Sequence, residues 1–316
     1  MTDVVCRAAL TLLLAALWSG CGGEPDSRRT ASGGGGGGAS PVASAAATVG
    51  PSDPNGLPRD RFHAGRAFAL LEKQVGFGER PAGSEASRAL ALELKSLLPS
   101  GRFENLSGGL RNVVGHLPGT RPAIVVAAHY DTKVIDGFVG AEDGAGGTAA
   151  VVELARGLRR LKRSRDAPEI RFVLFDGEEC DGDDADFYSC GLRGSRAYAK
   201  RHGKRNLGKV IVLDFIAQKD LAIRYEPGSD RSLWRQLRSA AKAVGALEVF
   251  PPDAQGTVLD DHTPFARAGI PAIDLIDFEF PCWHQTCDDL SVVSAASLDK
   301  SGESVFELVR RLGRRR

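Results

Sequence analysis

Two periodicities of hydrophobic residues alternate along the chain after about residue 60. Apolar residues recur at helical spacing over 62–74 and 84–98, and Pro81, Gly83 and Ser84 separate the two stretches. Ser84 stands where it can cap the second helix. Similar spacing predicts helices over 147–161 and 194–200.

Short apolar runs between these helices predict strands over 112–117, 123–128, 170–175 and 210–213, with a further strand over 272–276. Three of the runs are almost continuous Val, Ile, Leu, Ala and Phe, which is typical of strands buried on both faces. The alternation indicates an α/β fold with a largely parallel sheet covered by helices.

The first 58 residues do not follow this pattern. An apolar run of about eleven residues over 8–18 is too short to span a bilayer but suits a signal peptide. The segment LWSGC resembles a bacterial lipoprotein box, although Trp18 is larger than the residue usual there; plain export is the alternative. We expect a signal peptide over 1–20, a lipidated Cys21 with a flexible Gly/Ser/Ala/Pro linker over 21–58, and a catalytic domain over 59–316.

This organisation predicts an exported protein, either anchored to a membrane only through lipid on Cys21 or secreted. The net charge of +1, from 41 basic and 40 acidic residues, excludes a nucleic-acid protein that relies on phosphate neutralisation. The arginines near the C-terminus are expected at a solvated helix end. The sequence does not decide the oligomeric state.

Acids and histidines collect where the predicted strands end. They are His129 and Asp131, then Asp176, Glu178 and Glu179, then Asp214, and finally His284. Ligands of open α/β sheets bind in the crevice at the carboxyl ends of the strands. We therefore expect these side chains to meet at one site.

The adjacent Glu178 and Glu179 suggest a cation at that site. On a loop both carboxylates can enter one site, where they repel unless a cation or a shared proton intervenes. Zinc fits, with one Glu as ligand and the other as general base. His262 also has acidic neighbours, whereas His63, His116 and His202 are expected in surface or capping roles.

The Gly-rich segment 140–147 leads into a predicted helix and contains Asp143. Sequence geometry alone favours Asp143 as a helix cap, with a metal-binding role as the alternative. A nucleotide-binding loop is excluded, because neither Gly-Lys-Ser/Thr nor a Gly-x-Gly-x-x-Gly directly after a strand occurs.

Six short motifs occur in a specific order: HYDT from His129, GAxDGA from 140, FDGEE from 175, Leu213-Asp214, DDHxPF from Asp260, and Trp283-His284. In this order they resemble the zinc peptidase family that includes bacterial leucyl aminopeptidases and glutaminyl-peptide cyclotransferases. The resemblance covers about 62–312, and the FDGEE and DDHxPF motifs are closer to the cyclotransferase branch. It implies a single-domain, three-layer αβα sandwich around a mostly parallel mixed sheet.

The resemblance also implies roles for individual residues. Asp143, Glu179 and His284 match zinc ligands, and Glu178 matches the general acid/base. His129 and Asp214 match ligands of a second zinc in the aminopeptidases, whereas in cyclotransferases the equivalent groups lie near a single zinc. There Asp214 and Asp260 belong to a hydrogen-bond network, and Trp283 matches a wall of the substrate pocket.

The segment after the Glu pair departs from the animal cyclotransferases, which carry a pocket-lining Trp there. Phe187 or Tyr188 can take its place, and the acids of 181–186 can attract a cationic substrate terminus, although a solvated loop is the simpler interpretation.

Cys180 and Cys190 bracket this loop and Cys282 and Cys287 bracket His284. Export favours disulfides, and no Cys-x-x-Cys occurs that would suggest cysteine ligation of zinc. Four cysteines allow three pairings, and our hypothesis is the local one, Cys180 with Cys190 and Cys282 with Cys287.

Two reactions remain open. One is a glutaminyl-peptide cyclotransferase with one zinc, which converts an N-terminal Gln of a peptide or protein to pyroglutamate and releases ammonia. The other is an aminopeptidase with two zinc ions, which hydrolyses N-terminal residues. A non-catalytic tethered binding protein is a minor alternative that predicts missing ligands, and none is missing.

Overall fold

The six strands form one sheet in the order β1-β2-β4-β3-β5-β6 in the computed structural model, which describes residues 61–182 and 186–314. The strands are β1 (Arg102–Asn105), β2 (Arg111–Leu117), β3 (Thr120–His129), β4 (Pro168–Phe175), β5 (Leu207–Leu213) and β6 (Ala272–Leu275). β4, β3, β5 and β6 run parallel, whereas β1 and β2 are antiparallel to their neighbours. The predicted mostly parallel mixed sheet is confirmed.

Eight α-helices are described: α1 (Ala64–Val75), α2 (Glu85–Leu97), α3 (Gly147–Arg159), α4 (Phe187–Cys190), α5 (Arg193–Asn206), α6 (Arg231–Val244), α7 (Thr263–Arg267) and α8 (Ala295–Leu312). Short helical turns occur at Ser107–Gly109, Ala141–Gly146 and Leu247–Val249. Ser84 caps α2 as expected, and His63 caps α1 through its side chain.

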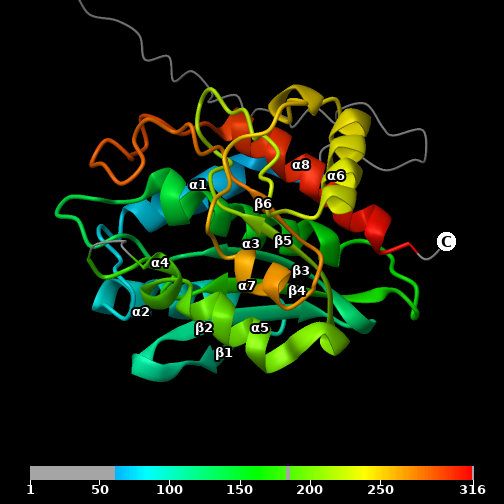
Figure 1. Cartoon of the computed structure of the whole chain (residues 1–316), viewed down its shortest axis with the longest axis horizontal. Coiled ribbons are helices and arrows are strands. Elements are labelled where there is room, and N and C mark those ends of the chain that lie inside the picture. Colours follow the sequence, from blue (N-terminus) through cyan, green and yellow to red (C-terminus); the bar gives the residue numbers. More distant parts are fainter. Residues whose placement is uncertain (1–60, 183–185, 315–316) are drawn as a thin grey trace, which may run out of the picture. The chain divides into compact units, whose positions relative to one another are not determined.

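Helices cover both faces of the sheet, and α1, α3, α6 and α8 lie on the face opposite to α5 and α7 (Figure 1). Alternate strand residues point to opposite faces. Ile124 and Val126 of β3 therefore pack beneath α3 and α8, whereas Val125 contacts the cluster that contains Tyr198 of α5. This three-layer arrangement confirms the predicted α/β sandwich.

The sequence patterns missed β1, α6 and the short helices α4 and α7. β1 is four residues long at the sheet edge and has one buried residue, Glu104, so it contains no apolar run. The described residues belong to one compact unit, Thr48–Arg316, and none of their helices is long and apolar enough to cross a bilayer. The predicted signal peptide, Cys21 and linker lie outside the described residues.

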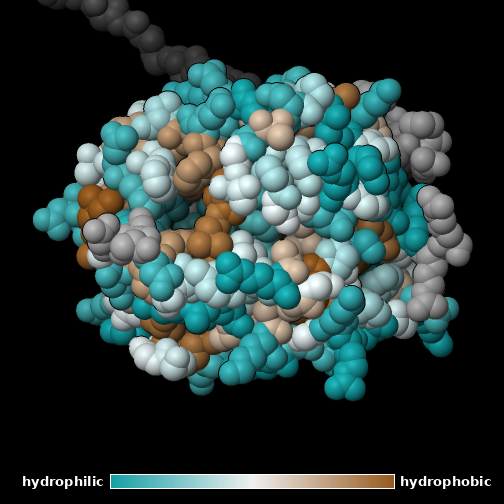
Figure 2. Space-filling model, in the orientation of Figure 1, coloured by the Kyte–Doolittle hydropathy of each residue, from teal (hydrophilic) through white to brown (hydrophobic). Residues whose placement is uncertain are grey.

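The face shown in Figure 2 is mostly hydrophilic, and apolar side chains gather around a hollow left of its centre.

Candidate active site

The carboxyl ends of the parallel strands deliver acids and histidines to one cavity of about 240 Å³. Its lining consists of Asp143, Glu178, Glu179, Phe187, Asp214, Phe215, Thr257, Val258, Leu259, Asp260, Ile276, Phe278, Trp283 and His284. Seven of the eight predicted site residues are in this lining. The eighth, His129, is the last residue of β3 and lies behind Asp143 and Asp214. The structure therefore brings all eight together.

Asp143 does not cap α3, and the prediction of a cap was wrong. It lies in the turn Ala141–Gly146 with non-helical backbone angles, and the N-cap of α3 is Gly146. Gly144, with φ of 99°, follows it in a conformation that favours glycine. The turn thereby directs the Asp143 carboxylate toward His129 instead of along the helix axis.

Glu178 and Glu179 both enter the cavity from the loop after β4. Asp131 fixes them, because its carboxylate accepts hydrogen bonds from the backbone N–H groups of Glu178 (3.2 Å) and Glu179 (3.1 Å). Burial and the charge of Glu179 raise the pKa of Glu178 well above its usual value. Burial and Asp143 raise the pKa of Glu179 to about 7. Both glutamates therefore favour a cation or a proton beside them.

One possible metal group consists of Asp143, Glu179 and His284. Nε2 of His284 lies 3.4 Å from Oε1 of Glu179 and 3.8 Å from Oδ2 of Asp143. Ligand atoms at zinc–ligand distances of about 2.1 Å stand about 3.4 Å apart in a tetrahedral site. Among the described residues, Oε2 of Glu179 is buried and accepts no hydrogen bond, although Nζ of Lys133 lies 3.6 Å from it as an ion-pair partner. This nitrogen and oxygen donor set fits a zinc ion.

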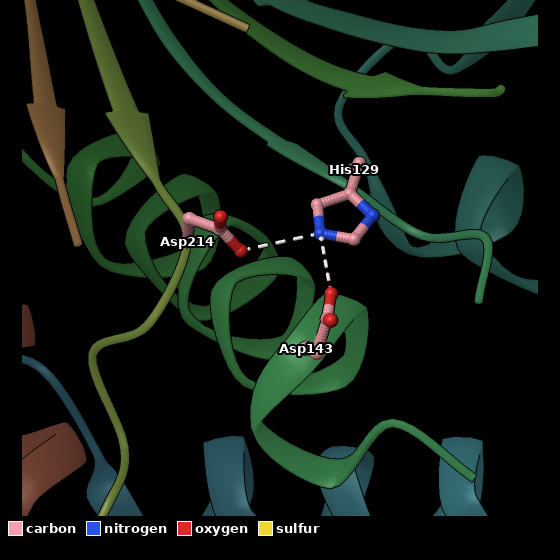
Figure 3. A group of neighbouring side chains, drawn as sticks. All are labelled: His129, Asp143 and Asp214. Atoms are coloured by element: carbon pink, nitrogen blue, oxygen red, sulfur yellow. Dashed lines mark hydrogen bonds and ion pairs between the residues drawn. The ribbon is translucent and has the colours of Figure 1, made fainter. Parts of the chain in front are cut away.

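His129, Asp143 and Asp214 form a second possible metal group that shares Asp143 with the first (Figure 3). Nε2 of His129 lies 3.2 Å from Oδ1 of Asp143 and 3.2 Å from Oδ1 of Asp214. Burial alone would lower the pKa of His129, but hydrogen bonds to Asp131, Asp143 and Asp214 raise it well above its usual value. The group is thus suited either to a second ion or to an imidazolium that neutralises the two acids.

Asp214 and Asp260 share the polar end of the cavity with Glu178. Burial and the charge of Asp260 raise the pKa of Asp214 to about 8. Both side chains are almost fully buried. A proton can therefore be held on this group of acids at neutral pH.

The opposite wall of the cavity is apolar. Trp283 is 41% exposed, stacks on the His284 imidazole with 4.5 Å between ring centroids, and lies 4.9 Å from the Phe278 ring. Phe187 lines the cavity, whereas Tyr188 faces Arg267, whose guanidinium lies 3.7 Å from the ring centroid. Of the two aromatic candidates, Phe187 is the one at the site.

Residues 112–309 match the sequence model of the family described as "Peptidase family M28". The chain belongs to peptidase family M28. The glutaminyl-peptide cyclotransferases of Drosophila melanogaster and Boiga irregularis are 27% and 30% identical to this M28 chain over 223 and 232 residues. Each match covers 60% of the chain and 61% of the relative's length. Aminopeptidase YwaD of Bacillus subtilis is 27% identical over 264 residues, covering 77% of the chain and 54% of that protein.

Solved structures resemble 80% of the M28 chain. Porphyromonas gingivalis glutaminyl cyclase superposes with a TM-score of 0.71 at 25% identity, covering 80% of the chain and 99% of that structure. A glutaminyl cyclase from an Acidobacteriales bacterium gives a TM-score of 0.69 at 27% identity, with coverages of 80% and 95%. The resemblance to the family of cyclotransferases and aminopeptidases is thereby confirmed.

Three further residues support the M28 site. Asp131 was expected there from its place at a strand end, whereas Asp288 and Arg80 were not predicted as site residues. Asp131 holds the Glu pair, and Asp288 accepts hydrogen bonds from the N–H groups of Glu142 (2.8 Å) and Asp143 (3.0 Å). Arg80 is completely buried and donates to the carbonyls of Val139 and Gly140. The sequence signal for Asp131 is its position after a predicted strand, and the only signal for Asp288 is its proximity to His284. No sequence pattern points to Arg80.

A third group, Asp260, His262 and Asp274, also has metal-ligand spacing. Here His262 pairs with Glu226 (3.1 Å) and Asp274 (3.4 Å). Burial alone would lower the pKa of His262, but Asp274 and Glu226 raise it to about 10. The positive charge of protonated His262 therefore explains how these acids can be buried together in the M28 chain.

The two predicted disulfides, Cys180–Cys190 and Cys282–Cys287, are both present. The first joins the two ends of the segment 180–190, which contains Phe187, and the second closes the loop that contains Trp283 and His284. Each disulfide therefore braces one wall of the cavity.

Proposed function

We propose that the chain is a zinc-dependent glutaminyl-peptide cyclotransferase that converts the N-terminal Gln of peptides or proteins to pyroglutamate. The observation that carries this proposal is the composition of the cavity. Three acids, Glu178, Asp214 and Asp260, line the same cavity as apolar and aromatic side chains that include Phe215 and Trp283. Such walls disfavour water, which a cyclisation does not consume but a hydrolysis requires.

Asp143, Glu179 and His284 would hold the zinc ion. Bound there, zinc would supply Lewis acidity toward the side-chain amide carbonyl of the substrate. His129 and Asp214 lie directly beside this group, and the contact of 3.2 Å between Nε2 of His129 and Oδ1 of Asp143 would keep Asp143 oriented.

Glu178 would move the proton. It takes a proton from the α-amine as that nitrogen bonds to the side-chain amide carbon, and it returns the proton as the bond to the departing NH₂ group breaks. The products are pyroglutamate and ammonia. A carboxylate whose pKa is raised by burial is suited to both halves of this exchange.

Trp283 and Phe187 would form the walls that hold the Gln side chain, and Asp214 and Asp260 would complete the hydrogen-bond network around Glu178. The names of the cyclotransferase relatives and of the bacterial glutaminyl cyclases support cyclisation of N-terminal Gln as the reaction.

The decisive experiment compares two peptides with the same purified enzyme. A Gln-initiated peptide is scored for ammonia release and for a blocked terminus, and a Leu-initiated peptide is scored for free Leu. Cyclisation of the first without cleavage of the second is expected. Cleavage of the second without cyclisation of the first would overturn the proposal.

An aminopeptidase is the second candidate, because His129, Asp143 and Asp214 form a group able to hold another ion. In that reaction Glu178 would take a proton from water as the water attacks the first peptide bond. About two zinc ions per chain, measured by mass spectrometry of the metal content, would favour hydrolysis, and about one would favour cyclisation.

We also propose that the protein is exported and anchored by lipid on Cys21, after removal of residues 1–20. The two disulfides agree with a compartment outside the cytoplasm. Labelling of cells with a radioactive fatty acid should mark the wild-type chain but not Cys21→Ala. Equal labelling, or recovery of unprocessed chain in the cytoplasm, would contradict this.

A further inference from the structure

The loop closed by the Cys282–Cys287 disulfide presents two side chains to the cavity, Trp283 and His284. His284 is the residue of this loop that approaches Glu179 and Asp143. Trp283 stacks on its imidazole, and Phe138 meets the imidazole edge-on at 6.4 Å. The orientation of the imidazole therefore depends on the path of this loop.

His284 has a φ of 51°, in the left-handed region that residues other than Gly rarely adopt. Such a backbone persists only where the surrounding structure imposes it. An unconstrained loop would relax toward negative φ, and that change would turn the imidazole away from Glu179.

The backbone hydrogen bonds of this loop that join described residues are local. The N–H of Trp283 donates to the carbonyl of Phe280, and that of Gln285 donates to the carbonyl of Cys282. The next anchor to the rest of the fold is Asp288, which holds the Asp143 turn. The disulfide is thus the covalent constraint that spans His284.

The other disulfide, Cys180–Cys190, follows Glu179 directly but adds less to that residue's position. Hydrogen bonds to Asp131 hold the N–H of Glu179, and the guanidinium of Arg193 donates to its carbonyl at 2.8 Å. The N–H of Leu192 donates to the carbonyl of Glu178 at 2.8 Å. These contacts do not depend on the S–S bond.

We propose that Cys282 and Cys287 are redox-controlled positioning residues for His284, so that the zinc site reaches full affinity only in the oxidised chain. The inference rests on the proposed zinc-binding role of His284. Oxidation removes two electrons and two protons from the two thiols and forms one S–S bond. A small disulfide such as oxidised glutathione accepts them and becomes two thiols.

In this scheme, a chain in a reducing compartment binds zinc weakly and is inactive, and it becomes competent after oxidation. The two loops also have separate functions. Loss of Cys282–Cys287 weakens zinc binding, whereas loss of Cys180–Cys190 moves Phe187 and raises KM with zinc affinity retained.

The test compares Cys282→Ser/Cys287→Ser with the matched control Cys180→Ser/Cys190→Ser, which also removes one disulfide. The zinc dissociation constant is measured by competition with a fluorescent chelator, and thermal unfolding of the zinc-free proteins reports stability. We expect zinc binding about 10- to 100-fold weaker in the first variant, the range for loss of a group that orients a ligand, and essentially unchanged in the control. Equal affinities in wild type and first variant, or equal weakening in both variants, would overturn the inference.

A second arm avoids mutation. The wild-type chain is reduced with a phosphine, since dithiols bind zinc themselves, and is then reoxidised with oxidised glutathione. Weaker zinc binding after reduction and recovery after oxidation are expected. If the reduced wild type binds zinc as tightly as the oxidised form, the inference that the disulfide controls zinc affinity is wrong.

His284→Ala separates this inference from the proposed reaction. If His284→Ala and the Cys282→Ser/Cys287→Ser variant both weaken zinc binding but the wild type cyclises no peptide, the proposed function fails and the redox inference stands. If the wild type cyclises Gln and the zinc dissociation constant is the same with and without the Cys282–Cys287 disulfide, the redox inference fails while the proposed function stands.

Discussion

Nε2 of His129 lies 3.2 Å from Oδ1 of Asp214, and both side chains are buried at the ends of neighbouring parallel strands. This pair lies behind Asp143, the residue shared by the two possible metal groups. Whether this pair binds a second zinc ion or supports the network around Glu178 therefore distinguishes the aminopeptidase reaction from the cyclotransferase reaction.

Asp214→Asn should lower kcat for Gln cyclisation about 10- to 100-fold, since it weakens the network around Glu178. The zinc content should stay near one ion per chain, as measured by elemental mass spectrometry. A fall from two ions to one would instead assign Asp214 as a ligand of a second zinc, and an unchanged kcat would remove it from the mechanism.

Glu178→Gln should reduce kcat by about 10²- to 10⁴-fold, because the amide cannot accept the α-amine proton. Zinc affinity should remain, as Glu178 is not among the expected ligands. The exposed Glu72→Gln serves as a control for loss of one carboxylate. Full activity of Glu178→Gln would show that another group moves the proton.

Asp288→Ala should weaken zinc binding about 10- to 100-fold, because the N–H groups of Glu142 and Asp143 lose their acceptor and the turn can shift. Chelator competition measures the effect. Asp289→Ala is the control, because this half-buried neighbouring carboxylate accepts a hydrogen bond from the N–H of Ser291 and not from the Asp143 turn. Equal zinc affinity in the two variants would show that other contacts hold the Asp143 turn.

Gly147→Ala should destabilise the protein, since a Cβ there would clash with the carbonyl oxygen of Leu213 at the contact between α3 and β5. We expect the free energy of unfolding to fall by about 1–3 kcal/mol, as for other overpacked positions. Gly65→Ala in α1, where a Cβ makes ordinary contact, should be neutral or slightly stabilising. Denaturant unfolding of both variants checks this, and equal stabilities would contradict the packing argument.

Glu307, which lies away from the active site, makes the free energy of unfolding depend on pH. Burial alone would raise its pKa, but hydrogen bonds from Arg310, Arg311 and Arg61 lower it to about 2. Since the folded-state pKa lies below the unfolded value of about 4.3, the stabilisation is present above that value and is lost as the pH falls toward 2.

Glu307→Gln should therefore lower the free energy of unfolding by about 1–3 kcal/mol at pH 7, with a smaller difference at pH 3. Denaturant unfolding of the zinc-free proteins at both pH values measures it. A difference that does not change with pH would show that Glu307 acts through packing and not through its charge.

The fold could be predicted well because its central strands are buried on both faces. Nearly continuous apolar runs such as 123–128 and 170–175 have few alternatives to a parallel sheet. β1 could not be found in this way, since its single buried residue is Glu104, whose carboxylate accepts hydrogen bonds from Arg201 and Arg102. Its pairing partner in β2 decides that it is a strand.

The sequence by itself determined the parallel centre of the sheet, the order of the motifs and the convergence of acids and histidines, because the carboxyl ends of parallel strands lie at one edge. Only the tertiary structure showed that Asp143 does not cap α3 and that its carboxylate points toward His129, since backbone angles in a turn of small residues are not encoded by spacing. It also decided that Phe187 and not Tyr188 faces the cavity, and that Asp131 and Asp288 hold the backbone behind Glu179 and Asp143. These choices depend on contacts between segments far apart in the chain, and local sequence carries little information about such contacts.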